Sequence, residues 1–577
     1  MRIALALLVF PALAHAATYE VGPGQTYTNI GDVPWPTIAA GDTVNIHARP
    51  TPYAEKFIVN ATGTASSPIL IQGIPDATGA LPILDGNNAI EATNENGFQD
   101  DTRFIIKIGD ASTPSNANGG AYITIQNLHI RNANPSYTFT SNREGAGVAY
   151  DQNAAAIWLQ HGDHLTVRGC EIENNGNGIF AAWGSGSPVS NVLVEGNYLH
   201  DNGIPNDAYE HNSYIQVDTV LYQFNHYAPP CPTCQGNNLK DRSSNMVARF
   251  NWIEGGERVM DLVDNSNSQL VSEPGYATSF VYGNILVKTD SAGNNALVHF
   301  GGDSGTTANY RTTLWFWNNT VVSTRTGHTY LFQLDTSSQT ANVVNNAIAN
   351  AVGPPPQILA SSGVANFDHN WITTGYSAGG TVTDTNTLTG TDPGFVDLAN
   401  GDYHLASGSP CINAAGALDP ALANYPLDHE YLAPQQGIAR ANDGQLDIGA
   451  YEFGTPVTTT TTTGSTSSTT GTTTATSTTT GTSSSTSTST STTTSGSTTS
   501  TSTTTGSSTS TSTSGSSGSS GTSHTSSSSG STSGSAGASG STGTTGSPAV
   551  KGGCGCSSGA DLGFLAFGAL LLLRRKR

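Results

Sequence analysis

Apolar and polar residues alternate over short stretches along most of the first 450 residues. Three clear examples lie around residues 123–125, 165–167 and 192–194. Alternation with a period of two is typical of β-strands that bury one face. A sustained run of apolar residues at the spacing of an amphipathic helix is lacking there. The pattern therefore predicts many short strands.

A six-residue phrase recurs among these strands. It begins with a hydrophobic or small residue and two variable residues. Its fourth residue is usually Asn, its fifth is variable, and its sixth is hydrophobic. Examples are YQFNHY from Tyr222, ARFNWI from Ala248 and VYGNIL from Val281. The fourth positions are separated by 24 to 42 residues and are Leu128, Cys170, Asn197, Asn225, Asn251, Asn284, Asn319, Asn346 and Asn370.

A repeat of this length predicts a solenoid, and strand patterning predicts a solenoid of stacked β-coils. Amides stacked at one turn can bond to each other and to the turn backbone, which gives the recurrent Asn a structural role. We predict an all-β fold, a right-handed single-stranded parallel β-helix. Cys170 falls in the Asn position and is expected to be a buried free thiol.

With these motifs, residues 18–453 resemble the pectate-lyase-like β-helix superfamily of secreted carbohydrate-active and surface proteins. The resemblance implies a β-helix over residues 17–391, with opening coils and a cap near its start. Residues 392–454, which contain GDYHLASGSPCINAAG and end DGQLDIGAYEF, resemble a C-terminal β-helix closing module. That module is expected to cover the open end of the core.

Both ends of the chain carry features of an exported protein. Residues 1–16 combine Arg2, an apolar run and an A-x-A cleavage site, which predicts a signal peptide; the alternative is a buried first strand. Residues 455–547 consist almost entirely of Ser, Thr and Gly, which predicts a disordered linker or stalk.

Residues 548–577 contain Cys554 and Cys556, a short apolar run and a basic end. They resemble myxobacterial C-terminal sorting signals, in which such a cysteine is the site of processing and anchoring. The alternative is a plain tail anchor. Either way, we expect a protein held at the cell surface or outer membrane through the cell envelope, or released from it.

Charge limits the partners. Charged residues make up 11% of the chain, and the formal net charge is −21. An acidic chain is a poor ligand for nucleic acid, and it repels a polyanionic glycan unless basic groups are concentrated locally. We expect a monomer whose partner is an extracellular polysaccharide.

Alignment of the strands that lie away from the Asn turn in successive coils predicts such a concentration. If Ile215, Leu239, Met260, Val298 and Phe332 point inward, the residue after each points outward. The outward column is then Trp158, Ala181, Gln216, Lys240, Asp261, His299 and Gln333, and a second column contains Trp183, Asp218, Arg242, Val263, Gly301 and Asp335. The alternative is that outward positions are simply polar. Asp241 should point inward, which requires an early turn or a bonded carboxylate.

These columns suggest a groove for sugars. Trp158 and Trp183 are suited to stacking on sugar rings, and Gln216 and His211 to contacting them. The insertions at residues 132–151 and 227–237 are expected to form its walls. Cys231 and Cys234, in the second insertion, predict a local disulfide or, as the alternative, half of a metal site.

The phrase LKDRSSNMVARFN resembles the catalytic region of β-helix polysaccharide lyases of the alginate-lyase and chondroitinase-B type. The resemblance implies that Lys240 or Arg242 is the base that abstracts the proton next to the uronate carboxylate. Arg258 is then the acid or carboxylate clamp, and His299 a further catalytic candidate. Asp218, Asp261 and Asp264 are hard oxygen ligands that could hold Ca²⁺ as cofactor.

Two other functions remain open. A β-helix glycoside hydrolase requires two carboxylates, here Asp218 and Asp261. A non-catalytic surface protein would use the same groove to bind glycan or a neighbouring cell. Loss of turnover in Lys240→Ala is expected of an enzyme, whereas an adhesin should depend on Trp158 and Trp183.

Overall fold

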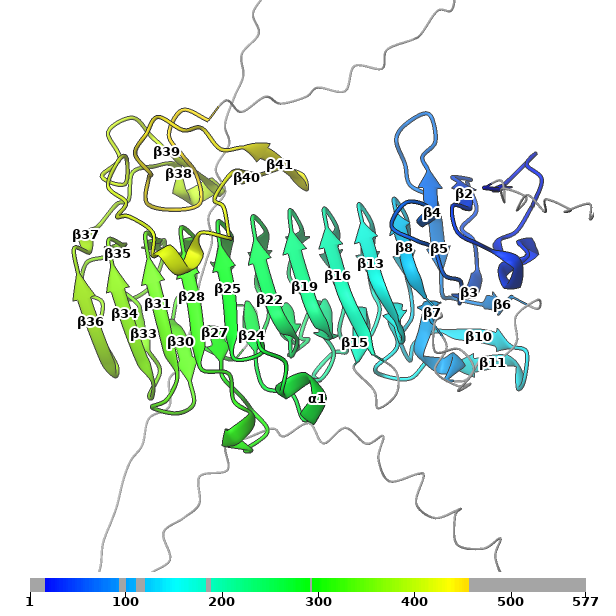
Figure 1. Ribbon diagram of the computed structural model, residues 1–577, viewed down its shortest axis with the longest axis horizontal. Helices are drawn as coiled ribbons and strands as arrows, with labels where there is room; N and C mark the ends of the chain where they lie inside the picture. Colours follow the sequence, from blue (N-terminus) through cyan, green and yellow to red (C-terminus); the bar gives the residue numbers. More distant parts are fainter. Residues whose placement is uncertain (1–15, 93–99, 110–119, 183–187, 291–292, 456–577) are drawn as a thin grey trace, which may run out of the picture. The chain divides into compact units, whose positions relative to one another are not determined.

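The computed structural model describes residues 16–92, 100–109, 120–182, 188–290 and 293–455. In this part the chain winds into coils whose strands form three sheets, all parallel except for one antiparallel pair at the end of sheet 2 (Figure 1). In one coil, β12 (Ala155–Leu159), β13 (Gly162–Arg168) and β14 (Glu171–Glu173) lie in sheets 2, 1 and 3, and β15 (Asn177–Ala182) returns to sheet 2. Since connections between parallel strands of a sheet are right-handed, this is the predicted right-handed parallel β-helix.

Sheet 1 has 13 strands, which in spatial order are β1 (Thr18–Val21), β2 (Thr43–His47), β4 (Ile69–Ile74), β8 (Ala121–Gln126), β13, β16 (Val189–Glu195), β19 (Asp218–Gln223), β22 (Ser244–Arg249), β25 (Thr278–Tyr282), β28 (Thr313–Trp317), β31 (Thr340–Val344), β34 (Val364–Asp368) and β36 (Thr381–Thr385).

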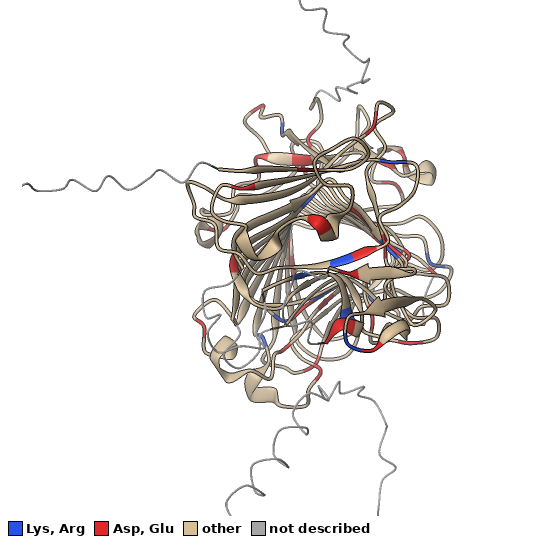
Figure 2. Cartoon of the chain, turned by 90° about the vertical axis from the view of Figure 1, so that its right-hand side faces the viewer, with Lys and Arg blue, Asp and Glu red and all other residues tan. Residues whose placement is uncertain are grey.

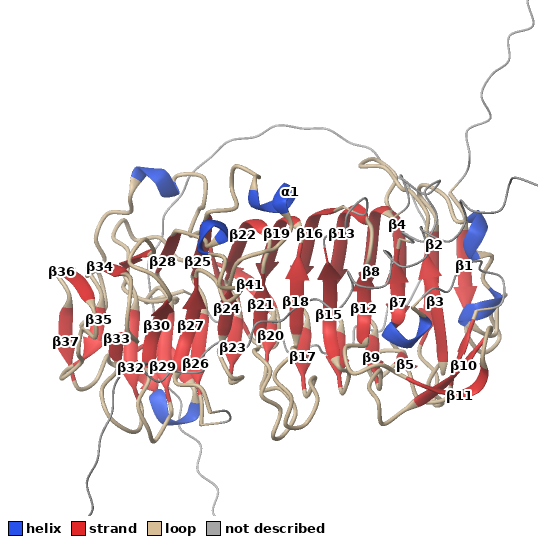
Figure 3. Cartoon of the chain, turned by 90° about the horizontal axis from the view of Figure 1, so that it is seen from below, coloured by secondary structure: helices blue, strands red, loops and turns tan. Residues whose placement is uncertain are grey.

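Sheet 2 also has 13 strands, which are β11 (Gly145–Ala149), β10 (Thr138–Ser141), β6 (Ala89–Glu91), β3 (Glu55–Val59), β7 (Phe104–Ile108), β12, β15, β18 (Ser213–Gln216), β21 (Leu239–Asp241), β24 (Met260–Leu262), β27 (Ala296–Phe300), β30 (Tyr330–Leu334) and β33 (Gln357–Leu359). Figure 3 shows most of these strands in a row between the other two sheets.

Sheet 3 has 11 strands, which are β37 (Leu388–Gly390), β35 (Trp371–Thr373), β32 (Ala347–Asn350), β29 (Thr320–Ser323), β26 (Ile285–Lys288), β23 (Trp252–Glu254), β20 (His226–Tyr227), β17 (Tyr198–His200), β14, β9 (His129–Arg131) and β5 (Ile83–Asp85). Figure 2 looks along the coil from the end that carries β1.

Helices in the described residues are short, and none is long and apolar enough to cross a membrane. They are α1 (Ser268–Val271), η1 (Ile30–Asp32), η2 (Trp35–Thr37), η3 (Asp101–Arg103), η5 (Thr307–Asn309), η6 (Leu398–Asn400) and η7 (Pro420–Leu422).

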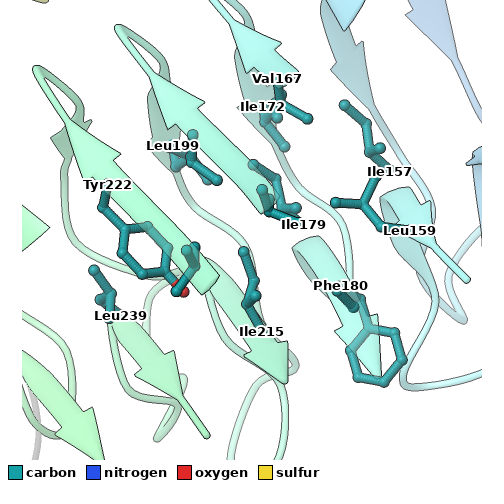
Figure 4. Packing of buried hydrophobic residues seen from close by; sticks show 14 of the residues in the cluster. Ile157, Leu159, Val167, Ile172, Ile179, Phe180, Leu199, Ile215, Tyr222 and Leu239 are labelled. Atoms are coloured by element: carbon teal, nitrogen blue, oxygen red, sulfur yellow. The ribbon is translucent and has the colours of Figure 1, made fainter. Parts of the chain in front are cut away.

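The core is a continuous column inside the coil. In sheet 1 alternate residues are buried, as the alternation predicts, for example Leu165 and Val167. Side chains from the three sheets meet there in every coil; in one coil they include Ile157, Val167 and Ile172 (Figure 4). In sheet 2, by contrast, strands such as β12 and β27 are buried at every position. The outward face of sheet 2 is therefore also covered.

The predicted Asn ladder is present at the turn between sheets 1 and 3. From Asn197 to Asn370, each amide nitrogen donates to the side-chain oxygen of the next Asn, at 2.9–3.0 Å. The backbone N–H of Cys170 donates to the Asn197 oxygen at 3.0 Å. Burial raises the pKa of the Cys170 thiol to about 12, so this free thiol is unreactive at neutral pH. A second ladder joins Asn175, Asn202, Asn212 and Asn238.

Asn251→Ala should destabilise the coil by about 2 kcal/mol, because the buried N–H groups of Asn225 lose their acceptor. Urea unfolding of wild type and variant measures this cost. The matched control is Asn366→Ala, since Asn366 lies on the half-buried outer face of sheet 1, where it pairs with Asn342. Equal costs for the two variants would contradict a special role for the buried ladder.

The C-terminal module contains two hairpins, β38 (Phe395–Asp397) with β39 (Asp402–Leu405), and β40 (His429–Leu432) with β41 (Gln436–Ala439). It packs along the side of the coil, where Tyr403 stacks on Trp252 and Asn318 bonds to the carbonyl of Asp447. The last strand of sheet 1, β36, remains largely exposed. The expectation of a cap over the open end was therefore wrong: apolar and aromatic side chains anchor the module to outward residues of sheets 1 and 3.

Several predicted features lie outside the described residues. They are nearly all of the signal peptide, Trp183, the Ser/Thr/Gly-rich linker, and the C-terminal signal with Cys554 and Cys556.

Candidate functional site

The last four residues of the predicted outward column lie side by side on sheet 2. Lys240 of β21 pairs in register with Asp261 of β24, followed by His299 of β27 and Gln333 of β30. We call these four residues the central row. Leu239 alternates with Lys240 and lies in the core. The apolar pattern of these strands was sufficient to fix their register.

The first half of the column was wrong by one or two residues. Phe180, not Ala181, lies beside Trp158, and Tyr214, not Gln216, lies beside Lys240. The inward residue of β18 that pairs with Leu239 is the buried Ser213, which bonds to the hydroxyl of Tyr227. A polar residue in the core is invisible to a hydrophobic pattern. In β15 both faces are buried, so alternation carries no parity signal.

Trp158 does not fit a sugar-stacking role. Its side chain lies beneath Arg103, whose guanidinium carbon is 4.6 Å from the ring centroid, and only 5% of the residue is exposed. The insertion at residues 132–151 forms the β10–β11 hairpin, which extends the β6 end of sheet 2 and does not border the central row. The insertion at residues 227–237 carries a disulfide between Cys231 and Cys234, and it reaches the row through Asn237, whose amide donates to Asp261 at 2.9 Å.

Lys240 is held in a buried ion pair. Its ammonium donates to Asp261 and lies 3.3 Å from Asp303. Burial opposes the charge on Lys240, but the carboxylate of Asp261, assisted by Asp303, raises the pKa of the amine above its ordinary value. A general base must be deprotonated before it can accept a proton. The geometry therefore does not fit Lys240 as the base.

Arg242 is bound to the loop that follows β27. One of its nitrogens donates to both carboxylate oxygens of Asp303 at 2.8 Å, and another donates to the carbonyl of Asp264. Asp264 in turn accepts from the backbone N–H of Asp303 at 2.9 Å and from the hydroxyl of Ser304. Sequence reasoning missed Asp303, since a loop residue far along the chain carries no strand periodicity.

His299 lies between two carboxylates. Its Nδ1 is 2.7 Å from Asp261 and its Nε2 is 2.8 Å from Asp335. Burial favours the neutral ring, but hydrogen bonds to Asp261 and Asp335 raise its pKa above 6.5. The side chain of Asp335 is 23% exposed. His299 is thus a shielded acid whose carboxylate partner reaches the surface.

Arg258 is the most accessible cation beside the central row. It precedes β24, its side chain is 20% exposed, and its Nη1 lies 3.9 Å from Asp261. Its Nη2 donates to Gln333 at 3.3 Å. Arg258, Gln333 and Asp335 therefore form the accessible edge of the site.

His211 and Gln216 lie close to the row. The Nδ1 of His211 accepts from the backbone N–H of Asn237 at 2.9 Å, and burial followed by the charge of Lys240 lowers its pKa well below 6.5. His211 is therefore a neutral, buried structural residue. Gln216 follows Ile215, so it lies beside Arg242, and it accepts from Asn265 at 3.2 Å.

The proposed Ca²⁺ ligands do not form a site. Asp218 belongs to sheet 1, where it accepts from Ser244 at 2.5 Å and from Asn245 at 3.1 Å. Both oxygens of Asp261 and of Asp264 already accept hydrogen bonds from protein groups. The separation of Asp218 from Asp261 on different sheets also removes the carboxylate pair that a hydrolase would require.

Glu210, next to His211, predicts a pH dependence. Burial and the neighbouring Asp207 raise its pKa to about 8, so the native state keeps a proton that the unfolded chain loses near pH 4.5. The free energy of unfolding should therefore fall as the pH rises from about 4.5 to about 8. Glu210→Gln should be more stable than wild type by several kcal/mol, at most about 5, above pH 8, and equal to it below pH 4.5. Urea unfolding at both pH values checks this, and equal stability at high pH would contradict it.

No protein-family model matches the chain, and no curated protein sequence matches it. Several solved structures are similar in fold. An alginate lyase from Paenibacillus sp. str. FPU-7 is 12% identical, with a TM-score of 0.37, over 63% of this chain and 99% of the lyase. The pectate lyase Pel9A is 13% identical, with a TM-score of 0.39, over 76% and 97%.

The lacto-N-biosidase of Eubacterium ramulus is 14% identical, with a TM-score of 0.37, over 65% of this chain and 68% of that enzyme. Similarity at this level assigns no activity to the chain. The function must follow from its own side chains.

Proposed function

We propose that this protein is exported, is tethered to the cell surface, and cleaves an extracellular uronate-containing polysaccharide by β-elimination. One observation carries the proposal: Arg258 and Asp335 both contact Gln333 at the accessible edge of the site, and the shielded His299 lies behind Asp335, in a chain with few charged residues. Together they offer a carboxylate clamp, an acid and a base.

In this mechanism Arg258 binds the uronate carboxylate, which acidifies the neighbouring C–H. Asp335 accepts that proton, the electrons form the C=C bond, and the bond to the leaving oxygen breaks. Protonated His299 gives its Nε2 proton to the leaving oxygen. Asp335 then returns the proton to the Nε2 of His299, which lies 2.8 Å from its carboxylate. Lys240 is a positioning residue, because it holds Asp261 against His299.

The test is incubation of the full chain with a panel of polyuronates, with ultraviolet absorbance reporting unsaturated ends. Wild type should produce them, and Arg258→Met should lose roughly 100-fold in kcat/KM. The matched control is Arg168→Met, because Arg168 forms an exposed pair with Glu195 on sheet 1. Turnover that is unchanged in Arg258→Met would overturn the assignment.

Non-catalytic glycan binding is the second candidate function. It is favoured by the pairing of Lys240 and Arg242 with Asp261 and Asp303, which leaves neither cation free. Polyuronate binding that depends on Arg258, without any unsaturated product, would establish this candidate. If the protein neither binds nor cleaves any polyuronate, both functions are excluded.

A further inference from the structure

A cluster of histidines and carboxylates lies on the outer face of sheet 3, away from the site described above. By register, Glu171 lies between His129 and Tyr198, and Glu173 lies between Arg131 and His200. Two neighbouring rows of ionisable side chains thus run across β9, β14 and β17.

The orientation of His200 is fixed from two sides. Its Nδ1 lies 2.7 Å from the carboxylate of Asp201, and Tyr198 stacks on its ring at a centroid distance of 4.2 Å. If Nδ1–H donates to Asp201, the lone pair of the imidazole is on Nε2. A carboxylate that fixes the tautomer of a histidine in this way is the usual outer partner of a metal ligand.

The Nε2 atom of His200 is buried and has no hydrogen-bond partner. It lies 3.6 Å from an oxygen of Glu171, which is too long for a hydrogen bond. An ion about 2.1 Å from each atom would bridge such a gap. In addition, ligand atoms of Glu173, His200 and Asp201 lie within 4.8 Å of one another.

The local charge also favours a cation. Glu171, Glu173 and Asp201 contribute three carboxylates. The nearby Arg131 lies closer to Asp85, at 3.0 Å, than to Glu173, at 3.8 Å. His129 contacts Glu173 at 2.9 Å and Glu171 at 3.8 Å. With neutral histidines, the cluster carries an excess of negative charge.

We propose that His200, through Nε2, binds a divalent transition-metal ion of the zinc class together with Glu171 and Glu173, while Asp201 holds the ring from Nδ1. Imidazole together with carboxylate suits zinc, whereas calcium and magnesium prefer oxygen ligands alone. Since Glu173 and His200 belong to successive coils, the ion fastens β14 to β17. It is a structural site, independent of any activity on polysaccharide.

The experiment measures thermal unfolding of the full chain, stripped with chelator, with and without ZnCl₂. Zinc should raise the unfolding midpoint of wild type, CaCl₂ should not, and His200→Gln should abolish the rise. Asp201→Asn should weaken zinc affinity by about 10- to 100-fold in calorimetry. The matched control is His164→Gln: His164 has the same contact with its neighbouring aspartate, at 2.8 Å, but lies on sheet 1.

Near-ultraviolet circular dichroism in chelator checks that each variant folds. If His200→Gln does not fold, Glu173→Gln takes its place and should also lose the response. An unchanged wild-type midpoint with zinc would overturn the proposal, and would mean that protonated histidines pair with the glutamates instead. A rise that persists in both His200→Gln and Glu173→Gln would place the ion elsewhere and overturn it as well.

Discussion

Asp241→Ala should lower the free energy of unfolding by about 3–5 kcal/mol. Asp241 and Arg311 are fully buried and lie 2.8 Å apart, and Asp241 also accepts from the hydroxyl of Tyr222 at 2.9 Å. Removal of the carboxylate leaves a guanidinium in the interior of the coil with no counter-charge. Equilibrium unfolding in urea measures the loss.

Two further variants make this prediction specific. Arg168→Ala removes the exposed partner of Glu195 and should cost less than about 1 kcal/mol. The double variant Asp241→Leu with Arg311→Met removes both charges and should recover most of the lost stability. A cost below about 1 kcal/mol for Asp241→Ala would show that Arg311 finds water or another partner.

The inward position of Asp241 could be predicted from sequence, but its partner could not. Its parity follows from Leu239 on the same strand, which lies in the core. Arg311 lies in the segment between β27 and β28, 70 residues further along the chain. Strand periodicity does not encode a contact made by a loop. The sequence therefore left a choice between an early turn and a bonded carboxylate, and it did not name the group to which the carboxylate bonds.

The two Asn ladders also differ in how far the sequence predicts them. Asn251 and its equivalents could be found because each coil repeats one hydrogen bond at one turn. The second ladder could not be predicted, because the 10 residues between Asn202 and Asn212 do not match the spacing of the repeat. Repetition is visible in a sequence when the spacing between coils is regular.

The sequence predicted where several residues of the site lie, but it did not predict their ionic states. Lys240, Asp261 and His299 lie in one row, as the apolar pattern indicated. The ionic state of Lys240 depends on which side chains surround it, and Asp303 arrives from a loop. A lysine beside a carboxylate keeps its proton, whereas a lysine beside another cation gives it up more easily. Sequence spacing cannot distinguish these two surroundings.

His299→Gln should reduce the proposed elimination by about 100- to 10,000-fold, because the leaving oxygen loses its proton donor. His328→Gln is the matched control, since His328 is exposed and contacts Tyr330 at a centroid distance of 5.9 Å. Steady-state kinetics on the polyuronate that wild type cleaves gives both values. Retained turnover in His299→Gln would remove the acid from the mechanism.

The pH profile separates an acid from a residue that merely supports the site. Burial opposes protonation of His299, but its bonds to Asp261 and Asp335 raise its pKa above 6.5. If the protonated ring is the acid, kcat of wild type should fall as the pH rises through the pKa of His299. The residual activity of His299→Gln should lack this decline, because glutamine does not titrate. The same decline in both proteins would assign the ionisation to another group and leave His299 a structural role beneath Asp335.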